Sequence, residues 1–360
     1  MTMRVAITTG GGDAPGLNAV IRAVVLAGTR RGWSMFGIRR GFAGLLDDAE
    51  PTPLPREAVR GITHLGGTIL GTTNRGNPFS WPTVRDGVTV ETDRSDELLD
   101  AFRRHRLDAL IVVGGDGTLG IGQRLWEKGM PVIGVPKTID NDVSGTVVTF
   151  GFDTAVTTAT EALDKLHPTA EAHDRLFVVE VMGRHAGWIA LHSGIAGTAD
   201  VILIPEIPYD IAKVADKVHE REAAGRNFTI VVVAEGAIPK DGTVTLKEEQ
   251  RAGQAARLGG VAERIAQELA ERTGKETRML TLGHLQRGGS PTTFDRLLAL
   301  RFGAAAVRAV AEKRFGQMVA LQPPNVVFVP ITEALRGSRG VPLDADVLRT
   351  ARDLGIALGD

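Results

Sequence analysis

The stretch GVPKTIDND at residues 134–142 decides how this chain folds and what it holds. It overlaps the end of the short apolar run 131–135, so it is expected where a buried strand ends and its loop begins. Two carboxylates, Asp140 and Asp142, stand one residue apart beside a Lys, a Thr and an Asn. Asn and Asp are also common in solvated turns. So many polar groups at one strand end exceed what packing needs, and they indicate a ligand site.

A second polar loop, GGDGT at 114–118, ends the preceding apolar run 109–113 in the same way. In open α/β sheets, ligands bind outside the carboxyl ends of the strands. Two neighbouring strands that each lead into an acidic loop therefore predict one site for a metal ion and a phosphate group.

The composition excludes several classes of protein. With 360 residues, of which 43% are hydrophobic and 24% charged, the chain is long enough for two packed lobes. Forty-two basic and 43 acidic side chains leave a formal charge of -1, so no basic field exists to hold nucleic acid. The absence of cysteine excludes disulfides, thiolate catalysis and Cys-ligated metal sites. No apolar run approaches the ~18 residues of a membrane span, and the N-terminus lacks the apolar core of a signal peptide. A cytoplasmic protein with no membrane partner is expected.

Strands and helices alternate along the chain. The expected strands cover 3–9, 109–113, 131–135, 176–181, 200–204, 228–233 and 277–282. The expected helices cover 17–30, 118–129, 151–166, 186–196, 211–223 and 255–272. This alternation predicts an α/β fold with parallel sheets covered by helices on both faces. So many strands favour two sheets, with a boundary near residue 150. Residues 41–100 are less regular, and the tail 336–360 is expected to be a final helix that packs across both lobes.

A glycine-rich loop, GGGDAPG at 10–16, lies between the first expected strand and helix. Backbone N–H groups and the helix dipole suit such a loop to hold a phosphate. Pro15 stands where the third Gly of a Gly-x-Gly-x-x-Gly motif would be, so this loop alone is weak evidence. The stretch 66–73 has the spacing of a Walker loop but lacks its Lys, which excludes that motif. Arg75 follows as a candidate phosphate ligand, or as an ordinary solvated arginine.

Further polar loops carry the resemblance to a known family. With the loops already described, they form the series GGGDAPGLN (10–18), GGDGT (114–118), PKTIDND (136–142), VEVMGRHAGW (179–188), AEG (234–236) and GHLQRGGSPTTFDR (283–296). With these motifs, in the family's order and at compatible spacings, the chain resembles the phosphofructokinase family over nearly its whole length. The arginines among them suit sugar phosphates, because a guanidinium meets phosphate oxygens bidentately.

The resemblance implies an α/β fold of two Rossmann-like lobes with mainly parallel sheets. The lobe for the phosphoryl donor and Mg²⁺ would be 1–151, with 286–335 returning to it. The lobe for fructose 6-phosphate would be 152–285, with 336–360 packing on it. The implied reaction is phosphorylation of the 1-hydroxyl of fructose 6-phosphate to fructose 1,6-bisphosphate, a step of glycolysis.

The resemblance also implies roles for individual residues. Asp140 matches the base that accepts the hydroxyl proton, and Asp116 matches the Mg²⁺ ligand, with Asp142 supporting the metal. Mg²⁺ favours a few carboxylates together with phosphates and water, which suits this sparse set. The groups implied to stabilise the moving phosphoryl group are Thr138, Arg184 and the Gly12 backbone N–H. The other implied contacts of the donor are Arg75, Gly117, Thr118 and Lys137.

Sugar recognition is implied for a third group of residues. They are Met182, Gly183, Arg184, Glu235, His284 and Arg287, beside Thr138, Asp140 and Asp142. Arg175 and Arg278 match arginines that bind the 6-phosphate across a subunit interface, which implies a homodimer or homotetramer with a shared site. The structural alternatives are core packing for Met182 and a hydrogen-bonded loop residue for His284.

Two positions bear on the phosphoryl donor, and they disagree. Family members that use pyrophosphate typically carry Asp after the metal-binding Asp and Lys before the Thr of the second loop. Here these positions are Gly117 and Lys137. Gly117 leaves room for the α-phosphate of ATP, and a flexible Lys can swing aside whereas a fixed carboxylate repels. ATP is therefore the expected donor, with pyrophosphate as the alternative.

The sequence also bears on regulation by effectors and on two alternative functions. Arg22 and Arg226 match basic positions of the family's effector site, but Leu26 and Ala224 replace others, so little response to ADP or phosphoenolpyruvate is expected. GGDGT also occurs in NAD kinases and lipid kinases, which should not need the loops 179–188 and 283–296. A non-catalytic sugar-phosphate sensor is expected to lose the base or the metal carboxylate, and both are retained here.

Overall fold

A computed structural model describes residues 2–47, 49–73, 76–85, 87–242, 246–248 and 257–360. The chain divides into two compact units. Unit 1 contains Met1–Ile139, Val143–Asp153 and Arg287–Ser338, and unit 2 contains Asp140–Asp142, Thr154–Gln286 and Arg339–Asp360. The lobes expected from the sequence placed residues 140–142 with the first part of the chain, whereas the structure groups them with the second.

Unit 1 is built on a seven-stranded sheet. Its strands, in spatial order, are β15 (Asn325–Pro330), β14 (Gln317–Gln322), β7 (Val132–Pro136), β6 (Ala109–Gly114), β1 (Arg4–Thr9), β2 (Ser34–Ile38) and β3 (Thr52–Pro53). The five strands from β14 to β2 are parallel. The edge strands β15 and β3 are antiparallel to their neighbours. The predicted α/β class with a mainly parallel sheet is confirmed.

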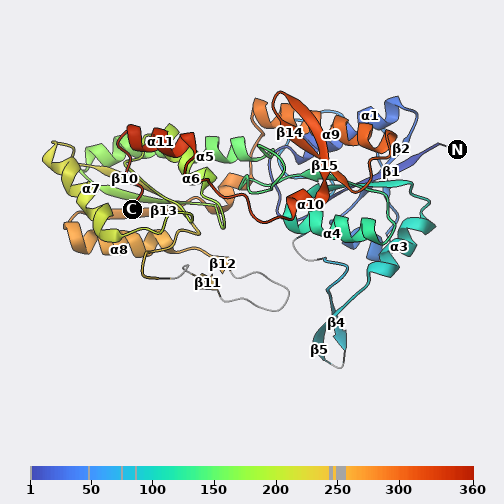
Figure 1. The fold of residues 1–360 in the computed structure, drawn as a ribbon, viewed down its shortest axis with the longest axis horizontal. Helices are drawn as coiled ribbons and strands as arrows, with labels where there is room; N and C mark the ends of the chain where they lie inside the picture. Colours follow the sequence, from blue (N-terminus) through green and yellow to red (C-terminus); the bar gives the residue numbers. More distant parts are fainter. Residues whose placement is uncertain (1, 48, 74–75, 86, 243–245, 249–256) are drawn as a thin grey trace. The chain divides into compact units, whose positions relative to one another are not determined.

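Helices cover both faces of this sheet (Figure 1). Side chains of β6 alternate between the two faces: Ile111 and Val113 pack in the cluster that includes α1 and α9, and Leu110 and Val112 pack in the opposite cluster. The helices of unit 1 are α1 (Leu17–Arg30), α2 (Ala43–Leu46), α3 (Ser95–Arg104), α4 (Asp116–Glu127), α9 (Thr293–Ala311) and α10 (Ile331–Ala334). A strand buried on both faces explains the uninterrupted apolar sequence of β6.

Unit 2 has a four-stranded, fully parallel sheet. Its spatial order is β13 (Thr277–Thr281), β8 (Leu176–Val181), β10 (Thr229–Ala234) and β9 (Val201–Leu203). Its helices are α5 (Phe152–Ala172), α6 (Trp188–Ala196), α7 (Ile211–Ala223), α8 (Val261–Thr273) and α11 (Asp346–Asp353). Leu176 and Val178 of β8 pack with Val214 and Val218 of α7 and Leu269 of α8 in one buried cluster.

The structure corrects several element boundaries. Helix α5 continues to Ala172, beyond the expected end at 166, and the first residue of α8 is Val261 rather than 255. Residues 249–256 lie outside the described part of the chain. The tail was expected to be one helix, but it contains only α11, because Gly337 with its φ of 121° and Pro342 prevent a continuous helix.

The irregular region 41–100 contains short elements. Besides α2, β3 and α3, they are the 3₁₀ turn η1 (Arg56–Val59) and the hairpin of β4 (Trp81–Arg85) and β5 (Val88–Thr92). Two further short elements are the antiparallel pair β11 (Leu246–Glu248) and β12 (Arg257–Leu258). Within the described residues, no helix has both the length and the apolar character that crossing a bilayer requires.

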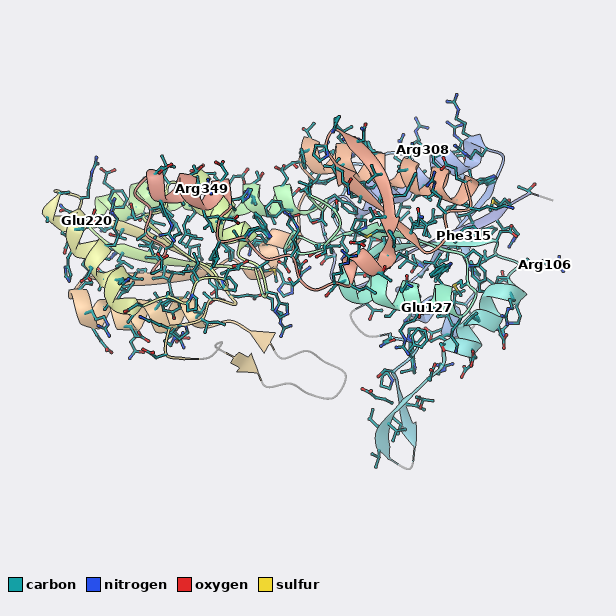
Figure 2. All side chains as sticks on the ribbon, in the orientation of Figure 1. Arg106, Glu127, Glu220, Arg308, Phe315 and Arg349 are labelled. Carbon is teal, nitrogen blue, oxygen red and sulfur yellow. The ribbon has the colours of Figure 1, made fainter. Side chains whose placement is uncertain are left out.

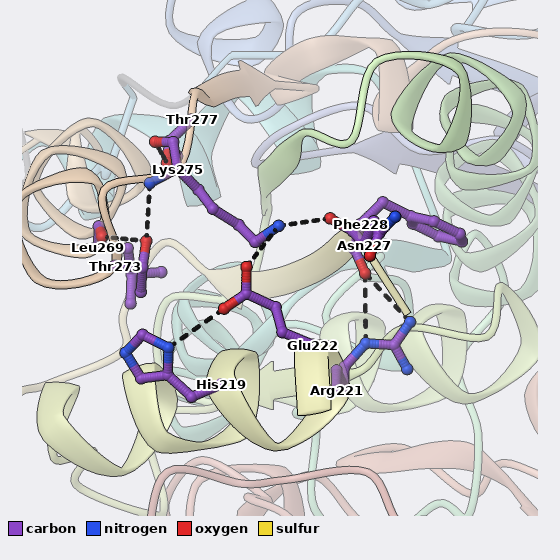
Figure 3. A network of polar contacts seen from close by, with 9 residues as sticks. All are labelled: His219, Arg221, Glu222, Asn227, Phe228, Leu269, Thr273, Lys275 and Thr277. Atoms are coloured by element: carbon purple, nitrogen blue, oxygen red, sulfur yellow. Dashed lines mark hydrogen bonds and ion pairs between the residues drawn. The ribbon is translucent and has the colours of Figure 1, made fainter. Parts of the chain in front are cut away.

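Charged side chains, such as Glu127 of α4 and Glu220 of α7, lie on the outside of the elements (Figure 2). In unit 2 some of them join into a network (Figure 3). Lys275 Nζ bonds Glu222 Oε1 at 2.8 Å and the Asn227 carbonyl at 2.6 Å, and His219 Nδ1 lies 3.2 Å from Glu222 Oε2. The hydrogen bond from Lys275 lowers the pKa of Glu222. These contacts tie α7 to the segments that lead into β10 and β13.

Glu180 of β8 is an acidic side chain in the core, only 3% exposed. Its Oε2 accepts hydrogen bonds from the backbone N–H of Gly260 at 3.1 Å and of Ala262 at 3.0 Å. The first N–H groups of a helix have no partner within the helix, so this carboxylate satisfies donors at the start of α8.

We expect Glu180→Ala to destabilise the protein by about 2 to 3 kcal/mol, because it leaves the buried N–H of Ala262 and the partly buried N–H of Gly260 without an acceptor. Thermal unfolding should show a midpoint lowered by roughly 3 to 4 °C. Glu161→Ala, on the exposed face of α5, is the control and should change stability by less than ~0.5 kcal/mol. Equal midpoints for the two variants would contradict the capping role.

Candidate active site

Three loops of unit 1 follow the adjacent parallel strands β1, β6 and β7. The backbone N–H of Gly10 donates to the Val113 carbonyl at 2.9 Å, and the N–H of Lys137 donates to the Gly114 carbonyl at 2.9 Å. The ladder of hydrogen bonds thus runs one residue past the strand ends and brings the three loops to one edge of the sheet. The sequence had predicted this for the two acidic loops, after β6 and β7.

Thr118 packs between two of these loops. Its side chain is only 8% exposed. A Cβ added at Gly10 would lie 2.8 Å from Thr118 Cγ2, and one added at Gly114 would also clash with Thr118. Close approach, rather than an unusual φ, therefore explains the glycine at these two positions. The predicted contact of Thr118 with the donor remains a prediction.

Lys137 is buried, with 3% of its surface exposed. Its Nζ donates to the carbonyl of Gly12 in the glycine-rich loop. The sequence interpretation treated this side chain as flexible and able to swing aside. The structure instead shows it tied to the loop that is predicted to hold phosphate, so its charge is already in place for an anion.

Asp116 is the first residue of α4 and is exposed. Its Oδ1 accepts a hydrogen bond from the Gly117 N–H at 2.7 Å, which fixes the carboxylate at the helix N-terminus. Apart from its chain neighbours and the nearby backbone of α4, no described atom lies within 4 Å of a Cβ added at Gly117. An exposed carboxylate beside open space fits a Mg²⁺ ion that takes most of its ligands from phosphates and water. Among the described residues, no cluster of three His, Asp or Glu side chains is placed to hold a metal.

The second acidic loop follows β7 directly. The carbonyl of Thr138 accepts a hydrogen bond from Thr149 Oγ1 at 2.8 Å. Asn141, between Asp140 and Asp142, is 4% exposed and has a φ of 54°, in the left-handed region that few residues other than Gly adopt. Such strain persists only where the surroundings fix it, and it is frequent at functional sites.

In unit 2, backbone hydrogen bonds also continue past the ends of β8, β10 and β13 and bring the loops that follow them to one edge of the sheet. The Glu235 N–H donates to the Val181 carbonyl at 2.9 Å, and the Leu282 N–H donates to the Glu180 carbonyl at 3.0 Å. The predicted residues that these loops carry at the carboxyl edge of the sheet are Met182, Gly183, Arg184, Glu235 and His284. His284 is exposed and the other four are partly or fully buried.

Gln286 links two of these loops, a role that the sequence interpretation missed. It is 0% exposed, its Oε1 accepts from the Met182 N–H at 3.3 Å, and its Nε2 donates to the Gly283 carbonyl at 3.1 Å. A Gln amide offers both a donor and an acceptor, which is what two backbone groups on different loops require. Gln286 lies inside the motif 283–296, so its position could have suggested a structural role in the site.

Arg175 and Arg278 lie at the other edge of the unit 2 sheet, where β8 and β13 begin. Both guanidinium groups bond Glu276 Oε1, Arg175 at 2.9 Å. The hydrogen bond from Arg175 lowers the pKa of Glu276. Within one chain, the structure therefore separates these two arginines from Met182 and His284.

Arg287 belongs to unit 1, and its Nη1 donates to the Asp13 carbonyl at 3.1 Å. Arg75 lies outside the described residues.

A cavity of about 250 Å³ is lined by Arg22, Leu26, Arg56, Glu57 and Arg60. A larger one of about 460 Å³, lined by residues of α9 and β15, contains no predicted site residue.

The sequence model of the phosphofructokinase family matches residues 4–310. The chain belongs to the phosphofructokinase family. An ATP-dependent 6-phosphofructokinase of Chloroflexus aggregans is 50% identical over 357 residues, 99% of this chain and 98% of the relative. A pyrophosphate–fructose 6-phosphate 1-phosphotransferase of Streptomyces coelicolor is 52% identical over 335 residues, 92% of this chain and 94% of the relative.

A solved structure of the family has the same fold. The phosphofructokinase of Pichia pastoris in the T-state superposes with a TM-score of 0.80 at 33% identity, and covers 93% of this chain. This chain spans only 35% of the Pichia chain. The recognition of the family from its loop motifs is confirmed.

Gly12→Ala tests how closely Arg287 approaches the glycine-rich loop of this phosphofructokinase. The new Cβ would lie 2.5 Å from Arg287 Nη1, so we expect the guanidinium to leave the Asp13 carbonyl. A flexible side chain can move cheaply, so stability should change by less than about 1 kcal/mol. A crystal structure of the variant is the measurement, and Gly117→Ala is the control, in which Arg287 should not move. An unmoved Arg287 in the Gly12 variant would contradict the expectation.

Proposed function

We propose that the protein transfers the γ-phosphoryl group of ATP to the 1-hydroxyl of fructose 6-phosphate, giving fructose 1,6-bisphosphate and ADP in the cytoplasm. The observation that carries the proposal is the acidic loop after β7, in which Asn141 is held in a left-handed conformation between two carboxylates. The identity of 50% to an ATP-dependent 6-phosphofructokinase over 99% of the chain supports it.

In the proposed reaction, Asp140 accepts the proton of the 1-hydroxyl while the hydroxyl oxygen bonds the γ-phosphorus. The bond from that phosphorus to the bridging oxygen of ADP breaks. A carboxylate with an ordinary pKa can serve, because the hydroxyl becomes acidic late in a loose transfer. Thr138, Arg184 and the Gly12 N–H would stabilise the charge of the moving group.

Asp116 would hold Mg²⁺, with Asp142 supporting it directly or through water. When bound, the ion neutralises phosphate charge. Lys137 Nζ, which is held at the Gly12 carbonyl, would add a fixed positive charge beside the phosphates. Gly117, Thr118 and Arg75 would complete the contacts with the donor.

For the sugar, we propose contacts from Met182, Gly183, Arg184, Glu235, His284 and Arg287. Arg175 and Arg278 would bind the 6-phosphate of a neighbouring subunit, which requires at least a homodimer and allows a homotetramer. Their position where β8 and β13 begin supports this, because Met182 and His284 follow the ends of the same strands. A phosphate dianion would have to replace Glu276 as the partner of both arginines.

Pyrophosphate is the second candidate donor. The presence of Lys137 and the identity of 52% to a pyrophosphate-dependent relative favour it. Gly117 favours ATP, because an Asp side chain there would occupy the space that no described atom fills. We give Gly117 the greater weight, since a fixed carboxylate both blocks and repels a nucleotide phosphate.

Asp140→Ser tests the proposed base. We expect kcat for fructose 6-phosphate to fall by about three orders of magnitude, the middle of the range for loss of a general base, while the sugar phosphate still binds. A coupled assay with Mg-ATP measures turnover, and calorimetry measures binding. Turnover within tenfold of the parent enzyme would exclude Asp140 as the base.

Gly117→Asp tests the choice of donor. The space around Gly117 lets the side chain fit without disturbing the fold. We therefore expect kcat/KM for ATP to fall at least tenfold, about 1.4 kcal/mol. Gly117→Asn is the control of matched size without charge, and it should lose less. Parallel assays with Mg-ATP and Mg-pyrophosphate give the measurement. Robust turnover of the parent enzyme with pyrophosphate alone would overturn the preference for ATP.

A further inference from the structure

Arg339 lies in the C-terminal segment, beyond the part of the chain that the family model matches. In unit 2 its Nη2 donates to the Asn141 carbonyl at 2.9 Å, and its backbone N–H donates to the Asp142 carbonyl at 2.7 Å. The residue thus holds two consecutive carbonyls of the acidic loop.

Arg339 is itself held in place by Trp188, at the start of α6. Its guanidinium lies 4.9 Å from the centroid of the Trp188 ring, and the Trp188 Nε1–H donates to the Arg339 carbonyl at 2.8 Å. Trp188 is only 8% exposed, so the aromatic face is a rigid platform. A guanidinium is planar and stacks on such a face while its N–H groups still donate in the plane, which an ammonium cannot do.

Glu206 anchors the segment that follows. Its Oε1 accepts from the Val341 N–H at 2.7 Å and from the Gly187 N–H at 3.0 Å. Gly187 directly precedes Trp188. The segment 339–341 is therefore fixed to the start of α6 at two points, and it presents Arg339 to the acidic loop from a rigid support.

The charge of Arg339 also matters to the loop. Burial lowers the pKa of its guanidinium, and the negative charge of Asp142 opposes this shift. The two groups therefore interact electrostatically.

We propose that Arg339 is a positioning residue for phosphoryl transfer: by holding the carbonyls of Asn141 and Asp142, it fixes the left-handed turn that aims the carboxylates of Asp140 and Asp142. Asn141 has a φ of 54°, a left-handed conformation that Asn adopts more readily than most residues but still at some cost, so contacts with its neighbours help to keep the turn. A misplacement of ~1 Å in a reacting group can cost about a hundredfold in rate. The proposal rests on the proposed function of Asp140.

The test compares Arg339→Ala with Arg349→Ala, a control on the exposed side of α11 (Figure 2). For Arg339→Ala we expect kcat with fructose 6-phosphate and Mg-ATP to fall about 10- to 100-fold, with KM for the sugar changed less than about threefold. Millimolar guanidinium added to the assay should restore part of the lost kcat. It should do nothing for the control.

A second measurement is independent of activity. In hydrogen–deuterium exchange, the peptide covering 137–146 should exchange at least threefold faster in Arg339→Ala than in the parent protein or in Arg349→Ala. If Arg339→Ala does not fold, Arg339→Lys takes its place. It keeps the charge but cannot both stack on Trp188 and reach the Asn141 carbonyl, so it should show the same two changes.

Unchanged exchange in the loop overturns the inference, and so does faster exchange with a kcat within twofold of the parent. A loss of kcat that comes with an equal rise in KM also overturns it, because that pattern indicates loss of sugar binding. If the parent protein itself does not phosphorylate fructose 6-phosphate, the proposed function fails. The exchange measurement still decides whether Arg339 holds the loop.

Discussion

The functional loops depend on backbone hydrogen bonds that continue past the ends of parallel strands. In unit 1 these are the bonds from Gly10 to Val113 and from Lys137 to Gly114. In unit 2 the bond from Glu235 to Val181 has the same role. Neighbouring parallel strands point the same way, so such bonds carry their loops to one edge with defined spacing. The sheet therefore fixes where the backbone of each loop lies, and with it the position from which each polar side chain extends.

Much of this arrangement could be predicted from the sequence. The run 109–113 is apolar, and 176–181 is apolar except for Glu180; each is followed at once by a polar loop, so strand ends and loop residues could be located together. The structure has these strands as Ala109–Gly114 and Leu176–Val181. Periodicity works well here because strands buried on both faces give continuous apolar stretches.

Contacts between distant segments could not be predicted. The hydrogen bond between Arg339 and Asn141 joins residues 198 apart in the sequence, and that between Gln286 and Met182 joins residues 104 apart. Arg339 lies outside every quoted motif, and Gln286 lies inside one, but the motif does not name Met182 as its partner. From the sequence, Gly10 and Gly114 were assigned to loops that bind phosphate. The structure gives a second reason for these glycines, because the side chain of Thr118 leaves no room for a Cβ at either position. Propensities and motifs describe a residue's neighbours in the sequence, whereas these residues contact segments that are distant in the sequence.

The order of the segments in unit 2 has a consequence for how the protein is made. A ribosome that has just added Asn141 must add 198 further residues before Arg339 exists to bond it. The acidic loop is therefore made before the side chain that later holds its turn. Trp188, whose indole N–H later donates to the Arg339 carbonyl, is also made before Arg339. The last 22 residues of the chain, 339–360, all belong to unit 2. This unit can thus reach its final form only after residues 339–360 have been made.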